Sequence, residues 1–206
     1  MKRFISFSGG VESTALCLLY GDKAKAITAD TGWEHPEMYE RWQEVEIRLR
    51  MIHPSFEIIR VKNQDYPGGL PEYIREQKFF PSFYSRYCTR LFKIEPIDRF
   101  LSSQGECELM IGLNADEGGK RTGNHGLQRN VKYTYPLLDN GITRAACLRL
   151  LRRHNLEPAF PPYMQRGGCV GCFFKSKKEY TAMHLLAPDQ FREVEKIEQE
   201  IQDVRG

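Results

Sequence analysis

Short apolar runs alternate with longer amphipathic segments through the first half of the sequence, and this alternation constrains the fold more than any other feature. Buried strands are predicted at residues 2–8, 24–30, 56–61 and 108–112, and helices at residues 12–20, 35–52 and 89–101. Strands that alternate with helices of this length form βαβ units. The predicted fold class is therefore α/β, with a mainly parallel sheet covered by helices on both faces. Such sheets bind ligands beyond the carboxyl ends of their strands, where the loops beginning at Ser8, Asp30, Lys62 and Leu113 lie.

The second half of the chain has a looser pattern. Residues 143–154 predict a helix, residues 157–172 are rich in proline and glycine, and the C-terminus predicts a further helix. We therefore expect an α/β domain over residues 1–140 and a C-terminal helical region over residues 141–206, packed on the same domain. An apolar stripe along the last helix predicts a core or homodimer contact: Phe191, Val194, Ile197, Ile201 and Val204.

Composition excludes several classes of protein. The 206 residues are 41% apolar and 28% charged, which is ordinary for a globular domain. No apolar run reaches the roughly 20 residues that cross a bilayer, and no apolar segment follows the basic pair near the start. We therefore expect a cytoplasmic protein without a membrane partner. A net charge of +3 permits an anionic partner without requiring one.

A glycine turn joins the first predicted strand to the first predicted helix. Gly9 and Gly10 let the backbone approach a phosphate closely, and the helix N-terminus offers free N–H groups and a positive dipole end. The Walker loop and the three-glycine dinucleotide fingerprint are both absent, and an ordinary capped turn is the alternative. Three hydroxyl groups surround the turn: those of Ser8, Ser13 and Thr14.

Six cysteines divide into two groups. Cys17, Cys107 and Cys147 lie in apolar or helical contexts and are predicted to fill the core. Cys169 and Cys172 have the spacing with which two thiolates bind one metal ion, a spacing that zinc knuckles and redox pairs share. In a reducing compartment a disulfide is the less expected interpretation.

Several segments together resemble the PP-loop ATP pyrophosphatases, and most closely their phosphoadenosine phosphosulfate (PAPS) reductase branch. Residues 8–13, Ser-Gly-Gly-Val-Glu-Ser, resemble the Ser-Gly-Gly-x-Asp-Ser signature, with Glu12 at the position of the usual Asp. The resemblance covers roughly residues 4–175 in the family's order. Its other segments are 29–37 (Asp-Thr-Gly and Pro-Glu), 86–96 (Cys and Lys-Ile-x-Pro), 111–117 (Gly-x-Arg-x-x-Glu), 135–137 (Pro-Leu) and 168–172 (Gly-Cys-x-x-Cys).

This resemblance implies a fold like that of the adenine nucleotide alpha-hydrolases, with about five parallel strands. It also implies that the protein binds an adenine nucleotide, with ATP and Mg²⁺ as the expected ligands and chemistry at the α-phosphate. The longer side chain of Glu12 makes its contact with Mg²⁺ less secure than the anion site itself. The residues implied for nucleotide binding are Ser8, Gly9, Gly10, Glu12, Ser13, Thr14 and Asp30.

The family also places a cysteine at the position of Cys88 beside the Cys-x-x-Cys pair. Three thiolates suit a 4Fe–4S cluster with one open iron. Two alternatives remain: a zinc site with His125, His184 or a carboxylate as fourth ligand, or three reduced thiols without metal. PAPS reductases carry a further catalytic cysteine in a C-terminal Glu-Cys-Gly-Leu-His segment, and this sequence has none after Cys172. Reduction of PAPS by the known route is therefore not the first expectation.

We expect an enzyme that adenylylates its substrate with release of pyrophosphate and then transfers sulfur, through Cys88, Cys169 and Cys172, to a nucleobase or nucleic acid such as tRNA or DNA. A sulfur-donor protein is an expected partner. Lys93, Arg90 and Arg121 are the candidates for stabilising charge. The alternatives are a reductase-like enzyme acting on PAPS or its unphosphorylated analogue, and a non-catalytic nucleotide- or RNA-binding module with a structural metal. Residues 66–87 are rich in aromatic side chains, which suits either base stacking or the packing of a long loop.

Overall fold

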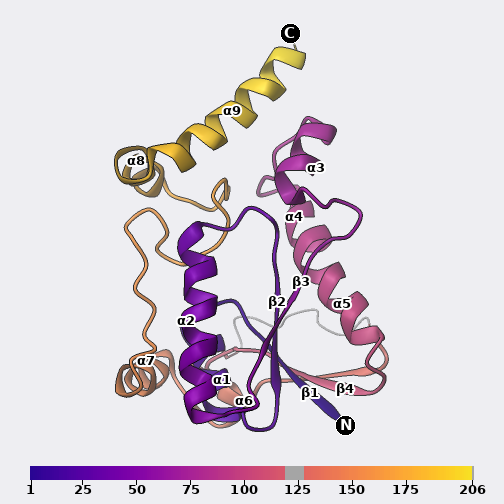
Figure 1. Ribbon diagram of the computed structural model, residues 1–206, viewed down its shortest axis with the longest axis vertical. Helices are drawn as coiled ribbons and strands as arrows, with labels where there is room; N and C mark the ends of the chain where they lie inside the picture. Colours follow the sequence, from indigo (N-terminus) through magenta and orange to yellow (C-terminus); the bar gives the residue numbers. More distant parts are fainter. Residues whose placement is uncertain (119–127, 206) are drawn as a thin grey trace. The chain divides into compact units, whose positions relative to one another are not determined.

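The computed structural model describes residues 1–118 and 128–205, with the backbone alone for residues 204 and 205. It contains a five-stranded parallel sheet in the order β3-β2-β1-β4-β5 (Figure 1). β1 pairs in parallel with both β2 and β4, in a register that sets Phe4 beside Lys25 on one side and Leu109 on the other. The strands are β1 (Lys2–Ser6), β2 (Lys25–Ala29), β3 (Ile58–Val61), β4 (Cys107–Met110) and β5 (Val131–Thr134).

Both faces of the sheet carry apolar side chains, because successive residues of a strand point to opposite faces. On one face Phe4 and Leu109 pack with Leu101 of α5 (Glu95–Ser102). The neighbouring residues Ile5 and Met110 point to the other face and are also buried. A second group of helices packs near the sheet: α1 (Val11–Tyr20) contacts β1 and also the helices α6 (Pro136–Asp139) and α7 (Arg144–Arg153). Helices on both faces are what the sequence predicts, so the predicted fold class is confirmed.

The chain forms two compact units that interleave along the sequence. The first comprises residues 1–28, 40–61 and 97–158 and contains the sheet; the second comprises residues 29–39, 62–96 and 159–206. The predicted boundary at residue 140, with the C-terminal region packed on the same domain, stays a prediction. The remaining elements are α2 (Pro36–Ile52), α3 (Gly69–Gln77), α4 (Tyr87–Thr89), the π-helix η1 (Arg90–Ile94), the 3-10 helix η2 (Ala115–Glu117), α8 (Lys177–Leu186) and α9 (Pro188–Arg205).

The predicted strands and helices of the first half all occur, with ends that differ by a few residues. The helix predicted at 89–101 begins two residues earlier and contains a π-helical turn, Arg90–Ile94. The sequence analysis does not predict α3, because its nine residues lie in a stretch whose aromatic and glycine residues hide the helical period. The helical C-terminus consists of two helices, α8 and α9, separated at Ala187, and the predicted apolar stripe lies on α9. Within the part of the chain that the structure describes, no helix is long and apolar enough to cross a membrane.

Candidate functional site

The glycine turn after β1 has the geometry of an anion site. Gly9 has a φ of 77°, in the left-handed region that glycine adopts without strain. Gly10 is the N-cap of α1 and offers no side chain to cap the first turn of the helix. The N–H groups of that turn have no acceptor within the helix, so they are available to a phosphate. Gly112, two residues after β4, lies close to the first turn of α1: a Cβ added to Gly112 would stand 3.1 Å from the Ser13 nitrogen.

Two serine hydroxyl groups brace this turn. The Ser8 N–H donates to Ser13 Oγ at 3.2 Å, and the two serine Oγ atoms are also 3.2 Å apart. Ser13 Oγ in turn donates to the Gly10 carbonyl at 3.3 Å. Thr14 is fully buried, and its Oγ1 has no hydrogen-bond partner among the described residues. Ser8 and Ser13 therefore fix the loop, whereas the Thr14 hydroxyl lies inside the unit.

Glu12 joins the phosphate loop to the loop after β4 and to the start of α7. Its Oε1 accepts a hydrogen bond from Asn114 Nδ2 at 3.1 Å and a charged one from Arg144 Nη1. The Arg144 backbone N–H donates to Asp116 Oδ2 at 2.9 Å, so both ends of this arginine are held. Asn114 stands where the family motif has arginine, and Arg144 brings a guanidinium to the same loop. The sequence analysis missed Arg144, because its distance along the chain from Glu12 gives no local signal.

These residues line a cleft of about 420 Å³ that carries more negative than positive charge. Three carboxylates, those of Glu12, Asp116 and Glu117, face one guanidinium, that of Arg144, among the described lining residues. A polyphosphate entering such a cleft needs a cation to offset the repulsion. Magnesium is commonly held by one or two carboxylates together with substrate phosphates, so this donor set suits Mg²⁺.

Asp30 directly follows β2 and has three partners in the second unit. Its Oδ1 accepts hydrogen bonds from the Gly32 N–H at 2.8 Å and the Tyr39 hydroxyl at 2.7 Å, and its Oδ2 lies 2.9 Å from Lys62 Nζ. Burial raises the pKa of Asp30, but these three donors outweigh it and hold the pKa below its usual value. Asp30 is thus an ionised anchor of its own loop, and its contact with a nucleotide stays a prediction.

The second unit places Cys169 beside a buried acid. Cys169 Sγ lies 3.4 Å from both Thr31 Oγ1 and Glu34 Oε1, and Thr31 donates to the same Glu34 oxygen at 2.9 Å. Lys93 Nζ lies 3.8 Å from Glu34 Oε1. The sequence analysis did not single out Thr31 or Glu34 as partners of the thiols, although the resemblance included the segment that contains them.

Electrostatics couples the three thiols through Lys93. Burial raises the pKa of Cys169 and of Cys88, whereas the nearby Lys93 ammonium acts to lower both. In return Cys169, Glu34, Cys172 and Cys88 raise the pKa of Lys93, so this lysine remains charged. The π-helical turn that carries Lys93 is a type of irregularity that occurs frequently at functional sites. The result is a thiol site with a fixed cation beside it.

The arrangement of these thiols is not a complete metal-ligand set. Thiolate donors suit an iron–sulfur cluster or zinc. Within residues 1–118 and 128–205, however, no three His, Cys, Asp or Glu side chains stand where they would hold one ion. The 4Fe–4S cluster and the zinc alternative therefore stay predictions.

The other predicted residues have varied positions. Arg90 is exposed, and its Nε lies 3.6 Å from Glu95 Oε1; no described contact joins Arg90 to the thiols. His184, one candidate fourth ligand, packs on Phe191 with ring centroids 4.8 Å apart. Arg121 and His125 lie outside the described residues.

The loop that contains Cys169 and Cys172 packs against the loop that contains Trp33 and Glu34, which follows β2. The Val170 N–H donates to the Trp33 carbonyl at 2.8 Å, and Glu34 and Cys169 form an antiparallel bridge. The Trp33 ring is buried, and its Nε1 donates to Glu193 at 2.9 Å. The backbone of Gly171 packs on this ring so closely that an added Cβ would stand 2.1 Å from Trp33 Cη2.

Replacing Gly171 with alanine is therefore expected to destabilise the thiol loop. The bonded ring of Trp33 cannot move away freely, so we expect Gly171→Ala to lower the free energy of unfolding by about 3 kcal/mol. Gly68→Ala is the matched control, because its added Cβ meets only the flexible Glu72 side chain. Urea unfolding of both variants measures the difference; equal losses would contradict the predicted clash.

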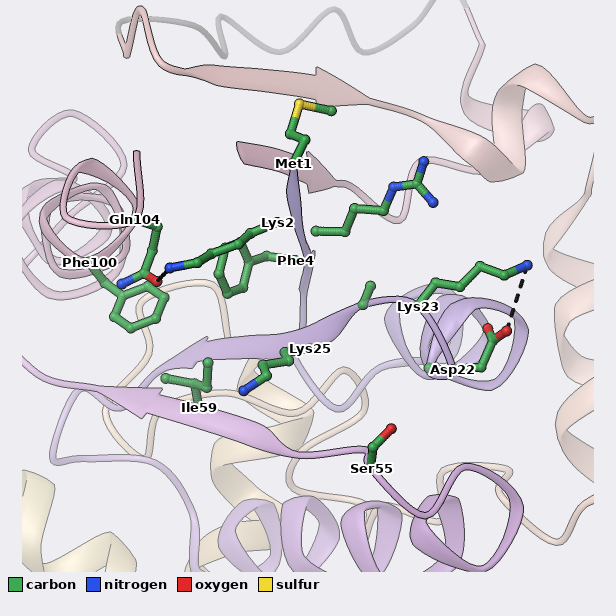
Figure 2. Close-up of a pocket in the computed structure, with 13 residues that line it drawn as sticks. Met1, Lys2, Phe4, Asp22, Lys23, Lys25, Ser55, Ile59, Phe100 and Gln104 are labelled. Atoms are coloured by element: carbon green, nitrogen blue, oxygen red, sulfur yellow. Dashed lines mark hydrogen bonds and ion pairs between the residues drawn. The ribbon is translucent and has the colours of Figure 1, made fainter. Parts of the chain in front are cut away.

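A different cleft, of about 640 Å³, lies at the amino ends of β1 and β2 (Figure 2). Its lysines already have polar partners: Lys2 bonds Gln104 at 2.9 Å, Lys25 lies 2.6 Å from Glu57, and Lys23 pairs with Asp22. Because ligands of open parallel sheets bind at the carboxyl ends of the strands, this cleft is not the candidate site.

Comparison with known proteins agrees with the motifs. A model of the phosphoadenosine phosphosulfate reductase domain matches residues 2–178. Among solved structures, a phosphoadenylyl-sulfate (PAPS) reductase from Candida auris in complex with phosphate is similar, with a TM-score of 0.53 and 14% sequence identity over 77% of this chain and 74% of that chain. At this identity the likeness shows the fold alone. No curated protein matches the sequence.

Proposed function

The chain belongs to the phosphoadenosine phosphosulfate reductase domain family, and from this premise we propose that it adenylylates a nucleobase or nucleic acid with ATP and replaces oxygen by sulfur. The phosphate loop binds the triphosphate, and the thiol site of Cys88, Cys169 and Cys172 receives sulfur from an external donor and delivers it to the base. An enzyme acting on sulfonucleotides is the alternative within the same family.

The charge of the phosphate-loop cleft is the observation that carries this proposal. Three carboxylates against one guanidinium disfavour a nucleotide that arrives without a metal ion. Mg²⁺ bound by Asp116 or Glu117 would neutralise the β- and γ-phosphates of ATP and stabilise the leaving pyrophosphate. A sulfonucleotide needs no pyrophosphate to leave, so it gives these acids no comparable role.

The first step forms one bond and breaks one. A carbonyl oxygen of the base attacks the α-phosphorus, the bond from that phosphorus to the bridging oxygen breaks, and pyrophosphate leaves. The Ser8–Ser13 turn holds the phosphates through backbone N–H groups, and Arg144, held by Glu12, offers charge to the developing negative oxygens. The product is a base whose carbonyl oxygen carries AMP.

The second step is redox-neutral when sulfur arrives at the oxidation level of sulfide. The sulfur attacks the activated carbon, the carbon–oxygen bond breaks, and AMP leaves with the original oxygen. Lys93 favours a sulfur anion at the thiol site by its charge, and Glu34 offers an acceptor for a thiol proton. Sulfide itself, or a persulfide together with a thiol reductant, supplies the sulfur.

One pair of reactions tests the proposal. The protein is incubated with ATP, Mg²⁺, sulfide and an RNA pool, and separately with PAPS and a dithiol. We expect pyrophosphate, AMP and thiolated base in equal amounts in the first reaction and no sulfite in the second. Sulfite from PAPS without pyrophosphate from ATP would establish the reductase alternative. Nucleotide binding without either product would establish a binding module.

A further inference from the structure

A group of aromatic rings lies exposed beside the thiols in the second unit. The exposed fractions are 70% for Phe83, 97% for Tyr84 and 42% for Phe174. Phe83 contacts both of the others, with ring centroids 5.8 Å from Tyr84 and 6.3 Å from Phe174. The guanidinium of Arg86 lies over the Phe174 ring, 5.2 Å from its centroid. We call these four residues the aromatic surface.

The aromatic surface lies on the same two segments of the chain as Cys88 and Cys172. Phe174 is two residues after Cys172, and Arg86 is two residues before Cys88. The contacts of Phe174 with Phe83 and Arg86 join the two segments that carry these cysteines. A ligand lying on the aromatic rings therefore lies on the segments of Cys88 and Cys172.

The two segments that carry the aromatic surface contain charged residues of one sign only. Residues 77–94 and 159–178 carry all three thiols and the aromatic surface, and together they contain eight basic residues and no acidic one. The whole chain has a net charge of only +3, so the positive charge is concentrated here. Arg166 Nη2 donates to the backbone carbonyl of Phe174 at 3.4 Å, so a second guanidinium contacts this residue. The eight are Lys78, Arg86, Arg90, Lys93, Arg166, Lys175, Lys177 and Lys178.

We infer that the aromatic surface binds single-stranded nucleic acid by stacking unpaired bases on Tyr84, Phe83 and Phe174. Exposed aromatic rings combined with a basic surface are how proteins hold unpaired strands, and arginine adds a cation–π contribution. A duplex offers its bases only in the grooves, so it gains the phosphate contacts but not the stacking. The inference names the acceptor of the proposed function; the binding itself requires neither ATP nor sulfur transfer.

A protein partner fits the surface less well. Aromatic residues and arginine are also enriched in protein interfaces. The eight basic residues, however, would require an equally one-signed acidic partner, whereas every nucleic-acid strand provides that charge. The nearest acids in sequence lie outside the two basic segments, and one of them, Glu179, is buried; they are Glu76, Glu95, Glu157 and Glu179.

Fluorescence anisotropy with a labelled 15-nucleotide oligouridine and a hairpin duplex of equal length tests the inference on the full chain without ATP. We expect tighter binding of the single strand, and a loss of about tenfold or more with Tyr84→Ala. Tyr84→Phe keeps the ring and is expected to bind within about twofold of the wild type. Arg86→Glu is expected to weaken binding and to flatten its dependence on salt.

Arg192→Ala is the matched control for charge, because Arg192 is an exposed arginine of the same unit, on α9, paired with Asp189. It is expected to leave binding unchanged. Equal binding of strand and duplex, or full binding by Tyr84→Ala, would overturn the inference. A change of oligomeric state in Tyr84→Ala with unchanged strand binding would assign the surface to a protein partner instead. If the wild type binds the single strand but releases no pyrophosphate from ATP in the separate activity assay, the result counts against the proposed function alone.

Discussion

Gly9→Ala is expected to weaken nucleotide binding about 100-fold, which corresponds to about 2.7 kcal/mol. Alanine is strained at the φ of 77° that Gly9 adopts, so the turn must change and carry its N–H groups away from the phosphate. Each charge-assisted hydrogen bond lost contributes about 1.5–3 kcal/mol. Calorimetric titration with ATP and with PAPS measures the effect whichever nucleotide is the substrate.

Gly105→Ala provides a control with matched backbone strain. Gly105 has a φ of 75°, and its added Cβ would meet nothing within 4 Å. It precedes β4, at the opposite end of the sheet from the phosphate loop. In both variants the free energy of unfolding is expected to fall by about 1–2 kcal/mol. Only Gly9→Ala is expected to bind nucleotide more weakly. Equal affinities in the two variants would refute the phosphate-loop assignment.

Cys169→Ala is expected to reduce sulfur transfer at least about 100-fold while pyrophosphate release stays within about threefold of the wild type. The thiol that contacts Glu34 and Thr31 is removed, whereas the phosphate loop of the first unit is untouched. Thiolated base and pyrophosphate are measured in the same reaction. Parallel loss of both products would show that the thiol site acts in adenylylation or in folding.

Cys107→Ala is the control for removing a buried thiol, because Cys107 lies in the sheet core and takes no part in the proposed chemistry. Iron, zinc and acid-labile sulfide are assayed in anaerobic preparations of all three proteins. About four irons per chain in the wild type and in Cys107→Ala, lost in Cys169→Ala, would support the predicted cluster. Stoichiometric zinc in the wild type and in Cys107→Ala, lost in Cys169→Ala, would support the zinc site. A wild-type protein without metal would support three reduced thiols.

The β1–turn–α1 segment shows what local sequence predicts well. Its apolar strand, two glycines and immediate helix are all local features, and the structure has each of them in place. The placing of Cys88 beside Cys169 and Cys172 was implied by the family resemblance rather than by spacing. Local pattern alone gives no distance between Cys88 and Cys169.

Arg144 and Trp33 show what sequence reasoning cannot reach. Arg144 belongs to the phosphate-loop cleft because it is the first residue of α7, after Thr143, whose hydroxyl caps the helix by accepting from the Ala146 N–H. Trp33 explains why a glycine stands inside the Cys-x-x-Cys pair, a reason that depends on a contact across 138 positions. Long-range packing of this kind leaves no periodic pattern in a single sequence.

The interleaving of the two units has a consequence for how the protein forms during synthesis. Every residue of the sheet-containing unit has been made by position 158, whereas Cys169 and Cys172 come later and must pair with the loop at Trp33 and Glu34. Contacts between such distant positions close slowly, because the chain loses much freedom before the contact forms. The sheet-containing unit therefore has its whole sequence available before synthesis ends, whereas the bridge between Glu34 and Cys169 must wait for residues made later.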